Sequence, residues 1–124
     1  MKIDAKSLEK LVWILYERYC HYQQIVLKDV KITIQDLLYL KLCFDYYRVE
    51  TKINAVGKVY LDGDLIIELE GTIQYGIIRL DFYKALQEYT KDIDYIRVSG
   101  KKLMIKNEYL KDIHLRNEIE LELL

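Results

Sequence analysis

Apolar residues recur along the first 28 residues at alternating steps of four and three, which predicts an amphipathic helix from Ser7 to about Lys28. Ser7 precedes this pattern and can cap the helix. The stripe contains Leu8, Val12, Leu15, Tyr19, Tyr22 and Val26, and it is widened by Leu11, Trp13, Ile14 and Tyr16. A helix with so broad an apolar surface needs partners on more than one side, either elements of its own fold or a second chain.

Residues 30–48 allow two interpretations. Val30–Ile34 alternates like a short strand, and Thr33 with Asp36 then resembles a capping signal for a helix from Ile34 to about Arg48. The competing interpretation is a strand, because apolar residues also alternate with period two at Leu38, Leu40, Leu42, Phe44 and Tyr46. We favour the helix, since so long a segment without a turn signal is unusual for a strand.

Turn signals are frequent after Val56. Asp62-Gly63 between two apolar runs predicts a hairpin with a type I′ turn. Glu70-Gly71 predicts a second turn, followed by a strand over 72–80 with a bulge at Gly76.

Asp81 is placed to cap a helix that runs to about Thr90. The side of this helix expected to be buried contains Phe82, Ala85, Leu86 and Tyr89. A hairpin with its loop at 99–101, one helical turn over Asn107–Asp112, and a strand over 118–123 complete the chain.

The predicted fold is therefore a single α+β domain over residues 1–124. Its N-terminal helices would pack on one face of a mostly antiparallel sheet, because the strands follow one another with hairpin turns. The predicted order is α-α-β-β-β-α-β-β plus a terminal strand.

Composition narrows the class of protein. Of the 124 residues, 52% are apolar and 31% are charged, which is typical of a globular chain. The net charge of −1 does not indicate a nucleic-acid coat or a membrane-surface protein. No apolar run is long enough to span a membrane, and the N-terminus lacks the features of a signal peptide. Cys20 and Cys43 lie in apolar segments, so we expect reduced thiols and a cytoplasmic protein.

The chain has no recognisable catalytic or cofactor motif, so we expect no cofactor and no resident metal, and a protein that is not an enzyme. Acidic residues could nevertheless form a metal site of a hydrolase, at Asp62, Asp64, Glu68 and Glu70. Glu50-Thr-Lys52, preceded by Asp36 or Asp45, also loosely resembles a nuclease signature. Ordinary turn chemistry explains Asp62-Gly63-Asp64 more simply. His21 and His114 are far apart in sequence and favour structural or surface roles.

A basic hairpin is the strongest local signal for nucleic-acid binding. Its cations fall within ten residues that contain no acid: Arg97, Lys101, Lys102 and Lys106. Such a hairpin could contact a phosphate backbone, and in this coarse sense the chain resembles winged-helix proteins, although three predicted strands interrupt their compact order. The alternative is a solvated hairpin whose lysines prevent edge-to-edge pairing of strands.

The aromatic surface of the first helix is the predicted interface, formed by Trp13, Tyr16, Tyr19 and Tyr22. Packing within the chain's own core is the alternative. We expect a small non-enzymatic interaction or regulatory protein that binds a macromolecular partner as a homodimer. A nucleic-acid-binding regulator is the second hypothesis, and a metal-dependent hydrolase the third. In size and charge the chain resembles accessory and regulatory proteins of mobile elements or small microbial operons.

Overall fold

The computed structural model describes residues 1–20 and 24–124 of the chain. It is an α+β fold in which the described strands predominate over two α-helices, and a π-helical turn, Tyr16–Cys20, continues the first helix. The elements are β1 Lys2–Ile3, α1 Ala5–Leu15, β2 Ile25–Ile34, β3 Leu38–Tyr46, β4 Val49–Asp62, β5 Asp64–Tyr75, β6 Ile78–Leu80, α2 Phe82–Thr90, β7 Ile96–Ser99, β8 Lys102–Ile105, β9 Leu110–Leu115 and β10 Ile119–Leu123.

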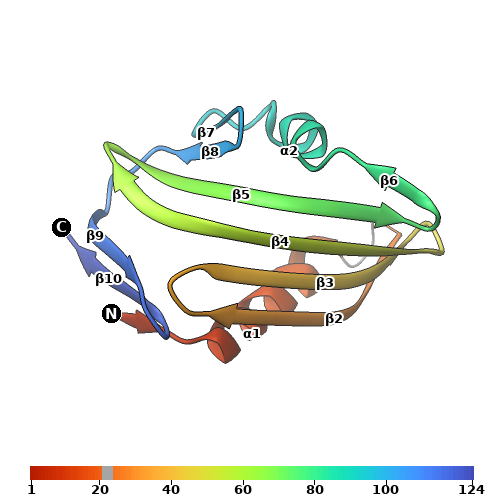
Figure 1. The fold of residues 1–124 in the computed structure, drawn as a ribbon, viewed down its shortest axis with the longest axis horizontal. Helices are drawn as coiled ribbons and strands as arrows, with labels where there is room; N and C mark the ends of the chain where they lie inside the picture. The colour runs from red at the N-terminus through yellow and green to blue at the C-terminus, as the bar shows by residue number, and fades with distance from the viewer. Residues whose placement is uncertain (21–23) are drawn as a thin grey trace.

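The strands form two antiparallel sheets. The larger sheet has the order β2-β3-β4-β5-β8-β7, and β6 pairs with the end of β5. The smaller sheet has the order β1-β10-β9, so the first and last strands are neighbours and both termini lie at one end of the molecule (Figure 1). The predicted antiparallel architecture is confirmed, whereas the predicted order of elements is wrong in its first half and lacks β9 in its second half.

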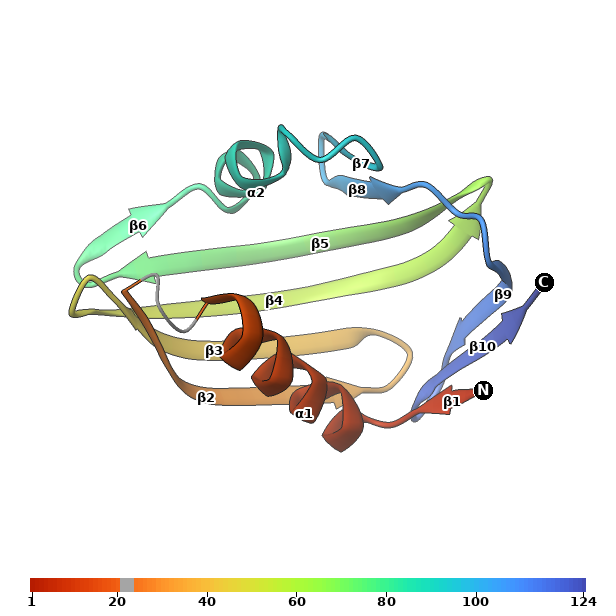
Figure 2. The same ribbon diagram turned by 180° about the vertical axis from the view of Figure 1, so that it is seen from behind.

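Both helices cover the same face of the larger sheet. Alternate residues of β2 are buried at Val30, Ile32 and Ile34, and they form one apolar cluster with α1. A second cluster joins Phe82 of α2 to β4 and β5. Leu40 of β3 packs against both clusters, so the clusters share one sheet face. Figure 2 shows α1 in front of β2 and β3, and α2 above β5.

The first helix begins earlier and ends earlier than the sequence predicts. Asp4 is its N-cap and accepts a hydrogen bond from the Ser7 backbone N–H at 2.7 Å. The predicted extension to Lys28 is wrong, because β2 begins at Ile25 and pairs with β3. Gln24, with φ of 61°, precedes that strand in a left-handed conformation that a helix does not allow. No described helix is both long and apolar enough to cross a membrane.

The predicted helix over residues 34–48 is also wrong, and the competing strand interpretation is confirmed as β3. The missing turn signal has a structural cause. The β3–β4 hairpin turns at Tyr47 and Arg48, whose φ angles are 50° and 66°. Turns of this kind normally contain Asn or Gly, because positive φ is costly for other residues. The sequence therefore lacks the usual signal at this turn.

Three smaller predictions are corrected. Glu70-Gly71 is not a turn, because Gly71 lies within β5, where an added Cβ would be 2.9 Å from the Asn54 carbonyl oxygen. Gly76 makes a turn between β5 and β6 at φ of 60°, rather than a bulge within one strand. Asn107 does not begin a helical turn, since its side chain accepts hydrogen bonds from two backbone N–H groups just before β9.

The most local predictions are confirmed. Gly63, at φ of 73°, lies at the tip of the predicted β4–β5 hairpin, but the predicted type I′ turn is wrong, because Asp62 pairs with Asp64 and its φ is not positive. Asp81 caps α2 by accepting hydrogen bonds from the two backbone N–H groups that follow Phe82. The β7–β8 hairpin and the terminal strand β10 are present as expected. On α2, Phe82 is buried as predicted, but Tyr89 is largely exposed.

Candidate functional site

Helix α1 has an apolar face that the fold does not cover. Leu8 and Val12 pack against the sheet, and a neighbouring side of the helix remains accessible. Leu11, Ile14 and Leu15 expose 45, 52 and 46% of their surfaces. Positions three and four apart lie on one side of a helix, so these three side chains form one continuous stripe. We call Leu11, Ile14 and Leu15 the outward stripe.

The predicted aromatic interface divides between the inside and the outside of the molecule. Trp13 packs against the core, and its ring meets that of Tyr16 edge-on, with centroids 6.1 Å apart. The Tyr16 hydroxyl donates to the Ile25 carbonyl of β2 at 2.9 Å. Tyr19 is 60% exposed in the π-helical turn that follows the outward stripe. Tyr22, like His21, lies outside the described residues.

The inner side of α1 is fixed to the edge of the sheet by polar contacts as well. Strand β2 is the terminal strand of the larger sheet, so some of its backbone groups have no strand partner. The Glu9 carboxylate accepts a hydrogen bond from the Ile32 N–H at 2.8 Å. With the Tyr16 bond to Ile25, this contact ties both halves of α1 to β2. The outward stripe is therefore held on a fixed helix rather than on a loose terminus.

The exposed area of the chain is large for its mass. Its surface measures 8899 Å², whereas a compact monomer of 14.9 kDa exposes about 7,000 Å². The excess of about 1,900 Å² exceeds the roughly 800 Å² that each partner buries in a standard protein interface. The core is correspondingly thin, and no side chain in residues 1–20 and 24–124 is fully buried.

The basic hairpin and the acidic cluster predicted from sequence lie at one place. Strand β8 pairs with β5 so that Lys102 is opposite Glu68. Three ion pairs join the two groups: Arg97 Nη2 to Asp64 Oδ2 at 3.6 Å, Lys102 Nζ to Glu68 Oε1 at 3.7 Å, and Lys101 Nζ to Glu70 Oε1 at 2.9 Å. The fourth cation, Lys106, pairs with Glu108 at 3.6 Å. Each acid and each base thus reduces the charge that the other offers to a ligand.

Glu68 has a further partner. The Tyr60 hydroxyl donates to its carboxylate at 2.5 Å, and this hydrogen bond lowers the pKa of Glu68. The same bond raises the pKa of Tyr60. Glu68 therefore already has two protein partners, Tyr60 and Lys102, at the position where a metal site would need a free carboxylate. Asp62 lies at the hairpin tip, opposite Asp64.

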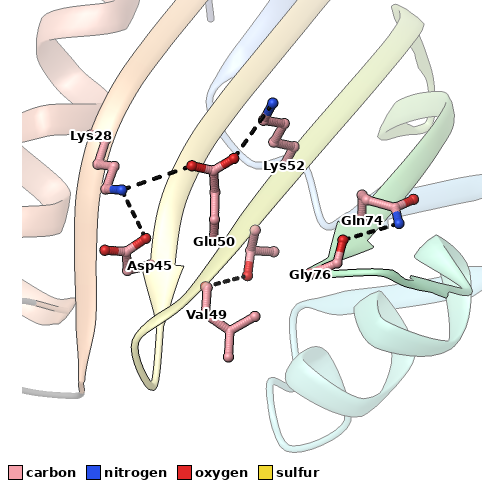
Figure 3. A network of polar contacts seen from close by, with 8 residues as sticks. Lys28, Asp45, Val49, Glu50, Lys52, Gln74 and Gly76 are labelled. Carbon is pink, nitrogen blue, oxygen red and sulfur yellow. Dashed lines mark hydrogen bonds and ion pairs between the residues drawn. The ribbon is translucent and has the colours of Figure 1, made fainter.

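The loose nuclease signature is brought together by the β3–β4 hairpin. Asp45 is directly opposite Glu50, and Lys52 Nζ is 3.5 Å from Glu50. The ammonium group of Lys28, however, lies between the two carboxylates, 3.1 Å from Asp45 and 3.9 Å from Glu50 (Figure 3). Lys28 projects from a bulge in β2, where the pairing with β3 shifts by one residue. A cation of the chain itself therefore neutralises the carboxylates that would bind a metal, while Asp36 takes no part in this network.

The other candidate ligands do not gather. His114 contacts Asp112 at 2.8 Å on the exposed side of β9. Within the part of the chain that the structure describes, no group of three or more His, Cys, Asp or Glu side chains has the geometry of a metal site. Cys20 and Cys43 are free thiols. The outward stripe, like Ile77 and Ile78, is an exposed apolar feature that these contacts do not cover.

Of the residues predicted to form an interface, Trp13 and Tyr16 contact the chain's own fold, whereas Tyr19 is exposed. On a helical projection Ile14 lies opposite Val12, but Leu15 lies close to Leu8, so the sequence pattern alone does not separate the exposed side chains from the buried ones. Comparisons with models of protein families, with curated proteins and with solved structures found no significant match to this chain. Function must therefore be inferred from the surface itself.

Proposed function

We propose that this protein is a small interaction or regulatory protein that is not an enzyme and binds its macromolecular partner as a homodimer. The outward stripe of α1 is the seam of the dimer, and Tyr19 extends it. The observation that carries the proposal is the exposure of the three apolar side chains of the outward stripe, on a helix that is fixed to the sheet by its other residues. Exposed apolar patches of this kind mark association surfaces.

A twofold dimer suits this surface. In an isologous interface the same patch meets itself, so a short apolar helix face can pack against its own copy without a second complementary surface. The excess exposed area of about 1,900 Å² leaves enough surface for such an interface and for a further partner. Burial of the outward stripe removes apolar side chains from water, which is the main driving force for association.

The macromolecular partner would be a protein in the cytoplasm, where the free thiols of Cys20 and Cys43 stay reduced. The nucleic-acid hypothesis ranks second, because the four cations of the β7–β8 hairpin are each paired with an acid. The metal-dependent hydrolase ranks third, because protein groups already contact Glu68 and Glu70.

The mass in solution tests the proposal. Light scattering on a sizing column should give twice the chain mass of 14.9 kDa for the wild type. Ile14→Lys and Tyr19→Lys should each shift the protein to the monomer, because a lysine cannot be buried unpaired in an apolar seam. Gln87→Lys adds the same charge on the exposed side of α2 and should leave the dimer intact. A monomeric wild type at concentrations of about 100 μM, where an interface worth −8 kcal/mol would form, contradicts the proposal.

A further inference from the structure

A cavity lies between α2 and the sheet. The N-terminal end of α2 is anchored by Phe82, whose ring lies over Gly71 of β5, where a Cβ would be 3.3 Å from the ring. At the other end of the helix, Tyr89 is 72% exposed. The space between this end and strands β3, β4 and β5 has a volume of about 210 Å³. It is a separate feature from the outward stripe of α1.

The walls of the cavity are apolar and rich in aromatic rings. Phe44, Tyr46, Phe82 and Tyr89 contribute rings, and aliphatic side chains such as Ile53 and Ile73 complete the lining. The lining contains no charged residue. Thr51 is buried there, and its hydroxyl donates to the Val49 carbonyl at 3.2 Å. An occupant of the cavity would therefore contact mainly hydrocarbon surface.

One polar feature belongs to this lining. Tyr46 and Tyr89 both line the cavity, and the neighbouring Tyr89 hydroxyl, with burial, raises the pKa of Tyr46. Because Tyr89 is exposed, this side of the cavity borders solvent. An occupant with a hydrogen-bonding group on one edge could place that group at the hydroxyls and its ring inside.

We propose that this cavity binds a small uncharged aromatic molecule with one polar edge. An apolar cavity of about 150 Å³ accommodates benzene, so 210 Å³ has room for a second fused ring or a short substituent. Aromatic ligands are favoured over aliphatic ones, because edge-to-face contacts with the four rings add to the burial of apolar surface. A charged ligand is disfavoured, because no group in the lining compensates for the loss of its hydration.

Indole is the probe that matches this chemistry, and indole-3-acetate is its charged counterpart. In a methyl-labelled sample of the whole chain, indole should cause saturable shifts at Ile53 and Ile73, with a dissociation constant below about 1 mM. Intermolecular Overhauser effects should connect the indole ring to these methyl groups. Indole-3-acetate should bind at least about tenfold more weakly.

Two variants locate the site. Ala85→Leu fills the cavity from α2 and should weaken indole binding by at least about tenfold, while the melting temperature stays the same or rises. Gln87→Leu adds the same side chain on the exposed side of the same helix and should bind indole like the wild type. The measurements of indole and indole-3-acetate binding to the wild type test the proposal even if Ala85→Leu does not fold. Absence of shifts at both isoleucines, shifts confined to other residues, or equal affinity for indole-3-acetate would overturn the proposal.

Discussion

The carboxylate of Glu9 in α1 accepts a hydrogen bond from the backbone N–H of Ile32 in β2, across a distance of 2.8 Å. The bond lets a helix cover the terminal strand of a sheet, in place of another strand. Exposed edge strands invite pairing with other chains, and this contact occupies the Ile32 N–H of such a strand. It holds the rest of α1, including the outward stripe, in a defined orientation.

Removal of the Glu9 carboxylate should destabilise the packing of α1 against β2. Glu9→Ala leaves the half-buried Ile32 N–H without a partner and should lower the free energy of unfolding by about 1.5 to 3 kcal/mol. Urea denaturation measures the change, and amide exchange at Ile32 should become faster. Glu9→Gln retains an acceptor oxygen and should cost less. Equal stability of Glu9→Ala and the wild type would show that the bond contributes nothing.

The β3–β4 turn should be open to stabilisation. Tyr47 and Arg48 both have positive φ, a conformation that costs about 1–2 kcal/mol for an ordinary L-residue. The double change Tyr47→Asn and Arg48→Gly introduces the sequence that such turns prefer and should raise the free energy of unfolding by about 1 kcal/mol. Thermal and urea denaturation provide the measurement.

A matched control separates the turn effect from the general effect of glycine. Arg116 is exposed in the connection between β9 and β10, and its φ is not positive. Arg116→Gly should therefore lower stability, because glycine there only increases the freedom of the unfolded chain. If both arginine-to-glycine changes destabilise the protein equally, the conformation assigned to Arg48 is wrong.

The Tyr60–Glu68 bond predicts a pH effect of defined sign. Because the bond lowers the pKa of Glu68 in the folded state, it contributes stability above the carboxyl's unfolded value of 4.5. That contribution is lost as the pH falls through the lower, folded value. Tyr60→Phe removes the donor, so the pKa of Glu68 should rise toward its usual range. NMR titration of the Glu68 side-chain carboxyl measures this shift, and an unchanged midpoint in Tyr60→Phe would assign the effect to Lys102 instead.

The ion pairs of the β7–β8 hairpin predict weak or absent binding to nucleic acid. Lys101 and Lys102 are paired with Glu70 and Glu68, so neither presents an uncompensated charge to phosphate. We expect no mobility shift with mixed DNA or RNA at low salt. The competing hypothesis predicts binding that weakens with salt. The slope of log affinity against log salt concentration should then fall in size by about two units in the double variant Lys101→Ala, Lys102→Ala. That result would make nucleic-acid binding the favoured function.

The accuracy of sequence reasoning depended on how local each signal was. The cap at Asp81 and the turn at Gly63 act within three residues, and both are where the pattern predicts them. The β3–β4 turn carries no glycine or asparagine, so its strands could not be separated from a helix by periodicity alone. Strand β1 pairs with β10 across almost the whole chain, and no short pattern reports such a contact.

The sequence predicted the helix that carries the candidate site, but it did not predict which side of that helix is exposed. The breadth of the apolar surface around α1 predicted partners on more than one side, either in the chain's own fold or in a second chain. Which part remained outside depended on the side from which β2 approaches, and that side is fixed by Glu9 and Tyr16 through backbone groups of the strand. Trp13 therefore faces inward, and Leu11, Ile14 and Leu15 face outward.

The most direct test of the dimer seam is a mixed sample of methyl-labelled and unlabelled protein. Isotope-filtered spectra report only contacts between two different chains. We expect intermolecular Overhauser effects from the methyl groups of Leu11, Ile14 and Leu15 to the same helix of the partner copy. Intermolecular contacts confined to other surfaces, or none at all in a protein of monomeric mass, would contradict the assignment of α1 as the association surface.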